Sequence, residues 1–485
     1  MDLEPIYLGK TRLEVEAVKL SNLTYKEPTI DWLKRFLSTG GDVQNKLSNT
    51  SVKERLKLID ELGKVWREKL NSGKLDHLKK NLVKTTGYSE RLIDMEFSLV
   101  SEVLNSENLV KLLDAGLKGG LASLEGPSEI ASNEYLMNVP AGPVFIISSG
   151  NSVIPPLIPT VVSLVVGNQT ILKPSISNYL AVKEVFEGFK EVLNSYADAS
   201  AYAEALLVSY FSHNSKALQY LLKEAPLGVV NYWGGDPGRL TVSKAVAENL
   251  NKPKLVVNGP LTGFAIVDEA SANEANAEKL AFDIVLYDQQ LCSSPTQAAF
   301  IGNFDSAVNF AKLLGKALDR VGLEFKIDLS EGHLYNIVKL RRALEYVRTT
   351  RNKVLYSTDP SNPWTLVVSE GRSTLAEVAS SINTTVYERR RFLELITVND
   401  LDQAVDLILN LRVNPAFTGV DKVQTVALAV SKDLELQAVR KLSRAGVYRI
   451  VPLGETYLRT PYEPYDGFSL PSVFTYSVYF RRGST

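Results

Sequence analysis

The stretch that decides the fold runs from residue 139 to residue 174 and reads VPAGPVFIISSGNSVIPPLIPTVVSLVVGNQTILKP. It carries no charged residue before Lys173, and in this respect it imitates a membrane-spanning segment. The polar run SSGNS at 148–152 and the prolines that follow it interrupt the pattern, however, so no run of about 20 apolar residues survives. We therefore predict a buried strand, a loop, a helix and a second buried strand.

Short β-rich runs continue to alternate with helical runs after residue 174. They comprise a helix through YLAVKEVFEGFKEVL (179–193), the strand GVVNYWGG (228–235), the helix GRLTVSKAVAENL (238–250) and the strand KLVVNG (254–259). Strands separated by helices are typical of a parallel, doubly wound sheet with right-handed crossovers. We therefore predict an α/β fold of the nucleotide-binding type.

A second alternating series begins at GFAIVDE (263–269). It includes a helix containing EKLAFDIVLYDQQ (278–290), the strand AAFIG (298–302), a helix after Asp305 and the strands TLVVSEG (365–371), FLELITV (392–398) and VQTVALAV (423–430). We expect a first domain over 1–257, helical before about 143, a second α/β domain over 258–445, and a return segment over 446–485. The alternating strand VFTYSVYF (473–480) near the C-terminus is expected to pair with another subunit in a homo-oligomer, a dimer or a tetramer.

Composition narrows the class of protein further. The 485 residues are 45% hydrophobic, enough for more than one core, and 54 basic residues against 55 acidic ones leave a net charge of -1. Such a balance disfavours binding to nucleic acid or to an anionic membrane. One cysteine cannot form an internal disulfide, and the first ten residues do not resemble a signal peptide, so we expect a cytoplasmic protein without membrane insertion.

The single cysteine, Cys292, lies in YDQQLCSSPTQ (287–297). A free cysteine is most often a small buried residue, which favours a packing role. The polar and helix-breaking neighbours argue against an apolar core position, so the local sequence leaves both a packing role and a reactive role open. His77, His213 and His333 are scattered without the spacing of a zinc site, and we expect no metal.

Five segments, taken in order, resemble the aldehyde dehydrogenase superfamily, and more closely its LuxC-type acyl-CoA reductase branch. They are VPAGPVFIISSGNS with Asn151, GNQTILKPS with Lys173, NYWGGD with Gly234 and Gly235, QQLCSSP with Cys292, and YERRRFLELITV with Glu388. The resemblance spans roughly residues 135 to 470. It implies a cofactor domain, a catalytic domain that holds the nucleophile, and an oligomerisation strand pair.

The resemblance implies that Cys292 is the nucleophile, which would hold the acyl group covalently while a cofactor exchanges hydride. Asn151 would donate its amide to the developing oxyanion together with the backbone N–H of Cys292, although an asparagine there also caps a helix well. Lys173 corresponds to the family's lysine to the adenosine ribose, and Glu388 to its glutamate on the nicotinamide ribose. YERRRF departs from the usual E-x-F-G-P, which leaves the role of Glu388 open.

Two departures from the family's pattern carry further expectations. Val256 stands where acid-forming aldehyde dehydrogenases have a glutamate base, so water would be poorly activated and an acyl-enzyme would persist for thiol exchange or hydride attack. Ile176 stands where NAD-preferring relatives have a glutamate, so Lys173 and Ser175 remain as donors to a 2′-phosphate.

The reaction expected from these features is NADPH-dependent reduction of a CoA thioester to an aldehyde. Acyl-phosphate reduction, aldehyde oxidation and a non-redox acyl carrier or scaffold with the same fold are the alternatives. A basic segment, KLRRALEYVRTTRNK (339–353), would meet the phosphates of CoA or form a solvated helix face, and the second interpretation is favoured.

Overall fold

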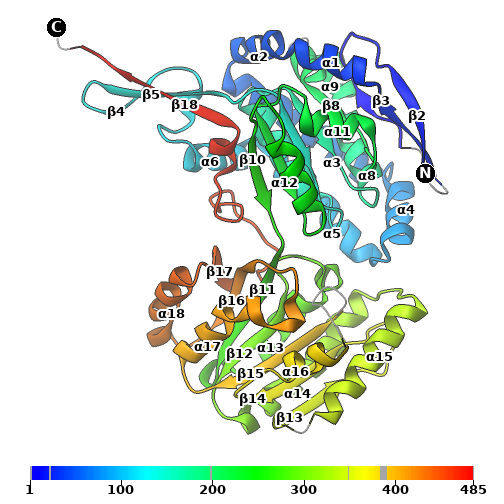
Figure 1. Ribbon diagram of the computed structural model, residues 1–485, viewed down its shortest axis with the longest axis vertical. Helices are drawn as coiled ribbons and strands as arrows, with labels where there is room; N and C mark the ends of the chain where they lie inside the picture. The colour runs from blue at the N-terminus through cyan, green and yellow to red at the C-terminus, as the bar shows by residue number, and fades with distance from the viewer. Residues whose placement is uncertain (1–2, 21–22, 197–198, 348, 383–389, 484–485) are drawn as a thin grey trace. The chain divides into compact units, whose positions relative to one another are not determined.

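The computed structural model describes residues 3–20, 23–196, 199–347, 349–382 and 390–483 (Figure 1). The chain forms two compact units. The first contains Met1–Leu82, Asp94–Asn258 and Thr460–Thr485, and the second contains Val83–Ile93 and Gly259–Arg459. The chain thus crosses to the second unit after Asn258, while the short stretch Val83–Ile93, inside the helical N-terminal part, packs with the second unit.

The main sheet of the first unit has the strand order β1-β8-β7-β6-β9-β10. Its strands are parallel except for the antiparallel edge strand β1. This arrangement is the predicted α/β class. The strand order reverses at β6, because β7 pairs with one edge of β6 and β9 pairs with the other. The bounds are β1 Ile6–Tyr7, β6 Val144–Ile147, β7 Thr170–Lys173, β8 Leu206–Val208, β9 Val229–Trp233 and β10 Lys254–Asn258.

Both faces of this sheet are covered. Phe145, Ile171 and Val230 pack in one apolar cluster with residues of α1, α11 and α12. Ile146 and Leu172 point to the opposite face, because side chains alternate along a strand, and they are fully buried as well. The stretch of residues 139–172 therefore carries no charge because it forms the centre of a two-sided core. Among the residues that the structure describes, no helix is long and apolar enough to cross a membrane.

The first unit contains several elements that the sequence did not predict. The predicted helix at 179–193 is divided at Gly188 into α8 and α9. The helices α10 and α11, the strands β1 and β8, the strands at 128–131 and 134–140 and the hairpin β2–β3 were not predicted. The hairpin consists of β2 Val15–Leu20 and β3 Leu23–Pro28. The helices are α1 Ile30–Ser38, α2 Gly40–Asn49, α3 Val52–Asn71, α4 Asp76–Thr86, α5 Glu90–Val103, α6 Ser106–Gly116, α7 Ile154–Val165, α8 Tyr179–Glu187, α9 Phe189–Ser195, α10 Ser200–Ala205, α11 Lys216–Lys223, α12 Gly238–Ala247 and α19 Leu470–Val473, with the 3-10 turn η1 at Leu121–Leu124.

A small antiparallel sheet of the first unit has the order β18-β5-β4. Its strands are β4 Ser128–Ala131, β5 Glu134–Pro140 and β18 Thr475–Arg481, so the C-terminal strand lies beside residues more than 300 positions earlier (Figure 1). Strand β18 is at the edge, and four of its large side chains, Tyr476, Val478, Tyr479 and Phe480, are about half exposed. An exposed edge of this kind presents unpaired backbone groups and apolar area together.

The sheet of the second unit has the strand order β13-β14-β15-β12-β11-β16-β17, and only the edge strand β13 is antiparallel. One of its faces is covered by a cluster that includes apolar residues of α15, α16, α17 and α18. The bounds are β11 Leu261–Asp268, β12 Pro295–Ile301, β13 Asn352–Tyr356, β14 Thr365–Glu370, β15 Phe392–Val398, β16 Lys422–Ala429 and β17 Arg449–Pro452.

The helices of the second unit connect these strands as the alternating pattern predicts. The predicted helix through residue 290 instead ends at Val285 and is followed by the turn η4. The bounds are η3 Glu269–Ser271, α13 Glu274–Val285, η4 Leu286–Gln289, α14 Phe304–Glu324, α15 Glu331–Tyr346, α16 Thr374–Ile382, α17 Leu401–Leu409, η6 Leu411–Val413, η7 Pro415–Phe417 and α18 Lys432–Arg444.

Candidate active site

Lys173 ends β7 at the carboxyl edge of the first sheet, where ligands of doubly wound folds bind. Its side chain is 7% exposed, and its ammonium lies 5.4 Å from the centre of the Tyr210 ring. Burial lowers the pKa of Lys173 to about 8, and no neighbouring charge among the described residues opposes that effect. A buried cation without a counter-ion fits a site for an anionic or hydroxyl-rich group such as a phosphorylated ribose.

Asn151 lies in the loop 148–152 between β6 and α7. The Ser149 hydroxyl donates to its Oδ1 at 3.0 Å, which fixes the direction of the amide. The alternative role as a helix cap is not what the structure shows, because the residue before the first turn of α7 is Val153. The N–H of Val153 instead donates to the buried carboxylate of Glu96 at 3.1 Å.

The loop of Asn151 lies against the turn that follows Lys173. Ser177 donates to the carbonyl oxygen of Gly150 at 2.7 Å and to the hydroxyl of Ser175 at 3.4 Å. A Cβ added at Gly150 would lie 2.5 Å from the Ser175 Oγ, so this close approach requires glycine. Ser175 is therefore partly engaged within the protein, while Ile176, at the same turn, is 36% exposed.

Gly234 and Gly235 follow β9, on the other side of β6 from Lys173. Gly234 has φ of +158°, and its N–H donates to the carbonyl oxygen of Asn258 at 3.0 Å. The Tyr232 hydroxyl donates to the carbonyl oxygen of Gly235 at 3.0 Å. These bonds hold the backbone after β9 at the carboxyl edge of the sheet, in the position where a doubly wound fold approaches a dinucleotide.

Val256 is buried within β10, and its side chain shares a face of the strand with that of Asn258. Asn258 donates to a buried carboxylate that the sequence did not single out, Asp466, at 3.1 Å. Asp466 has φ of +51° in the tight turn between Tyr465 and Phe468. This aspartate ties the return segment to the end of β10, two residues beyond Val256.

In the second unit, Cys292 is exposed and lies in the loop between η4 and β12. Three consecutive residues before it, Tyr287, Asp288 and Gln289, have φ of +54°, +50° and +61°. Such a left-handed turn is costly for residues other than glycine and persists only where its surroundings hold it. A strained turn that ends three residues before an exposed thiol indicates that the fold restricts the position of the loop that carries the thiol.

Two sets of buried contacts hold this turn. The Gln289 amide donates to the carbonyl oxygen of Pro295 at 2.7 Å, and its Oε1 accepts from the N–H of Phe392 at 2.7 Å. The Asp288 carboxylate is paired with Arg390 and with Arg391, the latter at 3.3 Å. Burial raises the pKa of Asp288, and the two guanidinium charges oppose that rise.

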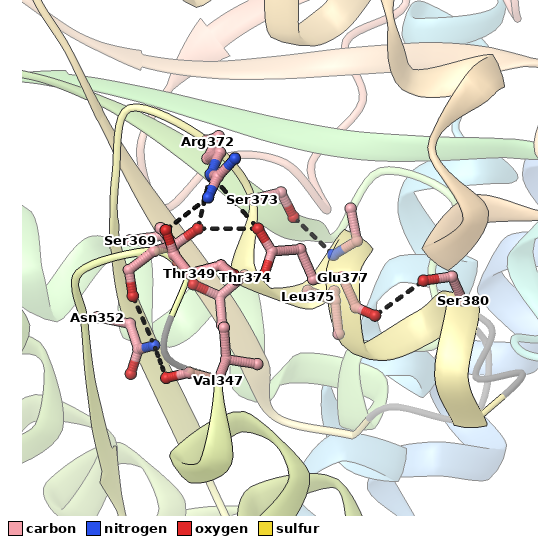
Figure 2. A network of polar contacts seen from close by, with 12 residues as sticks. Val347, Thr349, Asn352, Ser369, Arg372, Ser373, Thr374, Leu375, Glu377 and Ser380 are labelled. Carbon is pink, nitrogen blue, oxygen red and sulfur yellow. Dashed lines mark hydrogen bonds and ion pairs between the residues drawn. The ribbon is translucent and has the colours of Figure 1, made fainter.

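The segment YERRRF thus supplies two arginines that clamp the cysteine loop. Glu388, from the same segment, lies outside the described residues. The helix that precedes it, α16, is held at its start by the polar network of Figure 2, in which Arg372 reaches the carbonyl oxygen of Thr349 and Ser369 donates to Thr374 at 2.8 Å. The fully buried carboxylate of Glu394 on β15 accepts a hydrogen bond from the N–H of Leu375 at 3.0 Å. It thus pairs one of the backbone N–H groups that have no partner within the first turn of α16.

Cys292 has one neighbour that the sequence did not predict. The side chain of Gln424 on β16 lies within hydrogen-bonding distance of Sγ, with Nε2 at 3.3 Å. No motif marks Gln424, and only the pairing of the strands brings it to the cysteine.

Two arginines of the basic segment 339–353 and one histidine have partners within the second unit. Arg341 is buried and donates to Thr365 and to backbone carbonyls, and Arg351 pairs with Asp305 and Glu370, so these charges of the segment 339–353 are used within the unit. The ring of His333 contacts the hydroxyl of Ser330 on the surface. In the described part of the chain no group of histidine, cysteine and carboxylate side chains could hold a metal ion.

Solved structures with the same fold are aldehyde dehydrogenases. Aldehyde dehydrogenase 21 from Physcomitrella patens matches with a TM-score of 0.71 at 12% identity, over 99% of this chain and 98% of that chain. Glyceraldehyde-3-phosphate dehydrogenase GapN from Methanocaldococcus jannaschii, solved in complex with NADP, matches with a TM-score of 0.65 at 12% identity, over 94% and 95% of the two chains. The chain is therefore an α/β protein of the aldehyde dehydrogenase fold.

The family is defined by sequence. The acyl-CoA reductase (LuxC) model matches residues 47–473, so the chain belongs to that family, as its motifs led us to expect. Long-chain acyl-protein thioester reductase 2 of Photobacterium leiognathi is 24% identical over 267 residues, or 54% of this chain and 52% of the relative. The corresponding reductase of Aliivibrio fischeri is 23% identical over 311 residues, 62% of each chain. The chain spans about half the length of the first relatives it matches.

Proposed function

We propose that this protein is an NADPH-dependent acyl-thioester reductase that converts an acyl-CoA to an aldehyde through an acyl group bound to Cys292. The observation that carries the proposal is the exposed Cys292 in the loop that follows a strained turn held by buried contacts, in a chain of the acyl-CoA reductase (LuxC) family. An exposed thiol held in this way suits nucleophilic catalysis, whereas a packing cysteine would be buried.

In the proposed reaction the thiolate of Cys292 attacks the carbonyl carbon of the thioester. The C–S bond to CoA breaks and CoA leaves as its thiolate, so the acyl group is transferred to Cys292. NADPH, when bound, would supply the hydride that adds to the carbonyl carbon of the acyl group on Cys292. The C–S bond of the resulting thiohemiacetal alkoxide would then break, which releases the aldehyde and regenerates the Cys292 thiolate. We assign oxyanion stabilisation to the amide of Asn151 and the backbone N–H of Cys292.

The cofactor is assigned to the first unit. Lys173 would hold the phosphorylated adenosine ribose, with Ser175 beside it, and the backbone at Gly234 and Gly235 would approach the dinucleotide on the other side of β6. The buried ammonium of Lys173, which no charge among the described residues compensates, is the structural support for this assignment. Glu388 keeps the role that its motif suggests, the nicotinamide ribose, as a proposal from sequence alone.

The substrate class is tested by mixing the protein and NADPH with an acyl-CoA, an acyl phosphate or an acylated carrier protein, and by following NADPH absorbance and the mass of the intact protein. The acylated protein is included because the relatives are named as reductases of acyl-protein thioesters. We expect NADPH oxidation and a mass increase of one acyl group with the thioesters. Oxidation with acyl phosphate alone would identify an acyl-phosphate reductase, and acylation without oxidation would identify a non-redox acyl carrier.

We expect Asn151→Ala to lower kcat by on the order of a hundredfold, because one donor to the oxyanion is lost. The matched control is Ser149→Ala, which removes only the hydroxyl that directs the Asn151 amide and should lower kcat less. Steady-state kinetics and thermal melting of both variants are the measurement. A lower Tm at a normal kcat would show that Asn151 is structural.

We expect a preference for NADPH over NADH in kcat/KM, because no carboxylate stands at Ile176 to repel a 2′-phosphate and the buried Lys173 favours an anion. Ile176→Glu should shift the ratio towards NADH, and Ile176→Gln, which adds length without charge, is the control. Equal kcat/KM values for the two cofactors in the unmodified protein would contradict the expectation.

We expect the acyl-enzyme to hydrolyse slowly and to be discharged rapidly by added CoA, because Val256 cannot act as a base. Release of the acyl group from the isolated acyl-enzyme, followed by mass, measures both rates. Rapid hydrolysis that is lost in Asp466→Asn would identify that buried carboxylate as the base instead. Val256→Glu should raise hydrolysis if its carboxylate reaches the water near Cys292.

A homo-oligomer remains a prediction for the exposed strand β18. Its half-exposed apolar side chains and its free edge support pairing with a second copy of the chain.

A further inference from the structure

Gln424 is the third residue of β16, and 132 positions separate it from Cys292 in the chain. Its side chain is 1% exposed. Nε2 lies 3.3 Å from the sulfur of Cys292 and Oε1 lies 3.6 Å from it. Both residues belong to the second unit. A buried amide is therefore in direct contact with the atom to which the proposed function assigns the nucleophilic attack.

The backbone explains why the two residues meet. Gly263 on β11 pairs with Thr425, the neighbour of Gln424 on β16. A Cβ at Gly263 would lie 2.1 Å from the carbonyl oxygen of Ser293, so the loop of Cys292 crosses directly over this point of the sheet. The glycine lets the loop descend onto the strands, and Gln424 is the side chain that meets the sulfur there.

The amide of Gln424 has a defined orientation. The Thr425 hydroxyl donates to Oε1 at 3.1 Å, which satisfies the acceptor end of the amide. The donor end, Nε2, is the closer of the two polar atoms to Sγ. Buried amides are hydrogen-bonded in folded proteins, so a donor so close to sulfur indicates an N–H···S contact.

A hydrogen bond from N–H favours the charged form of the group that accepts it. A thiolate is a stronger acceptor than a thiol, because charge-assisted hydrogen bonds are about twice as strong as neutral ones. We infer that Gln424 is a positioning residue, which orients the sulfur of Cys292 and stabilises its thiolate by an N–H···S hydrogen bond. The inference deepens the proposed function and rests on it for its catalytic meaning, but not for the contact itself.

The chain allows a direct test, because Cys292 is its only thiol. The rate of alkylation by iodoacetamide is measured against pH in the absence of substrate and cofactor, and it reports the thiolate fraction of this one residue. We expect Gln424→Leu to slow alkylation at pH 7 by about tenfold or more, with the same plateau rate at high pH. Gln424→Asn, which keeps an amide, should recover part of the rate. Gln424→Glu places a negative charge beside the sulfur and should slow alkylation further.

Gln297→Leu is the matched control. Gln297 is also a buried glutamine of the same sheet, but its amide donates to Glu394 at 2.7 Å instead of to the sulfur. This control should lower Tm without moving the pH midpoint of alkylation. The inference is overturned if Gln424→Leu leaves the midpoint unchanged, or if Gln297→Leu moves it equally. Should Gln424→Leu fail to fold, the alkylation rates of Gln424→Asn and Gln424→Glu at pH 7 decide. The inference requires the Glu variant to be slower than the Asn variant, and equal rates would overturn it.

The two proposals fail differently. If Gln424→Leu shifts the pH midpoint of alkylation but a variant that lacks Cys292 still reduces the substrate fully, Gln424 does stabilise the thiolate. Cys292 is then not the nucleophile of the reaction. If Gln424→Leu leaves the midpoint unchanged but the variant without Cys292 loses reduction, Cys292 is the nucleophile. Gln424 then does not stabilise its thiolate.

Discussion

Cys292→Ala is expected to show no acyl adduct and no NADPH oxidation above background, which is the largest functional effect that the structure leads us to expect. The reason is that the chain has no second thiol, and alanine offers no nucleophile in its place. The mass of the intact protein after mixing with acyl-CoA and the absorbance of NADPH are the two measurements. Because Cys292 is exposed, its truncation leaves no buried cavity, and Tm should fall only by the loss of the contact with the buried Gln424 amide.

Two further variants make the experiment specific. Cys292→Ser keeps the shape of the side chain but supplies a much weaker nucleophile, so it should behave like the alanine variant. Ser293→Ala, next in the chain, should still form the adduct. Turnover or an acyl adduct in Cys292→Ala would reject the mechanism, whatever the other site residues do.

The sequence predicted the fold class because the apolar pattern itself sets it. Strands buried on both faces read as short runs of mostly apolar residues, and β6, β7 and β9 are of this kind. The hairpin β2–β3 was missed because most of its side chains are exposed or only half buried, so no alternating apolar pattern marks it. Strand β8 was missed because it is only three residues long.

The candidate site was predictable only where a motif is local. Cys292, Asn151 and Lys173 lie in short characteristic segments, whereas Gln424 reaches the cysteine from 132 positions away through strand pairing. The predicted helix at 278–290 was too long at its end, because α13 ends at Val285 and the polar residues before Cys292 form the turn η4 instead. Their burial was not predictable, because the arginines that pair with Asp288 are more than 100 positions further along.

Asp288→Ala is expected to cause the largest loss of stability, about 3–5 kcal/mol, because it leaves the fully buried Arg391 and the adjacent Arg390 without their carboxylate. Tm and the denaturant midpoint of the variant and of the unmodified protein, both at equal protein concentration, are the measurement. Asp305→Ala is the matched control: that aspartate pairs with Arg351 on the surface, where removal should cost about 1 kcal/mol or less. A loss in Asp288→Ala no larger than in the control would show that the clamp does not hold the unit.

Asp288→Gly separates the lost charge from the strain of the turn. Both variants lose the carboxylate, but glycine adopts φ of +50° without the cost of about 1 kcal/mol that alanine bears, so the glycine variant should be the more stable of the two. Alanine would also release the turn that carries Cys292, so thiol alkylation at pH 7 should change more in Asp288→Ala than in Asp288→Gly. Equal stability and equal alkylation in the two variants would show that the left-handed turn stores no strain, and that the loop of Cys292 is positioned by Gln289 and Gln424 alone.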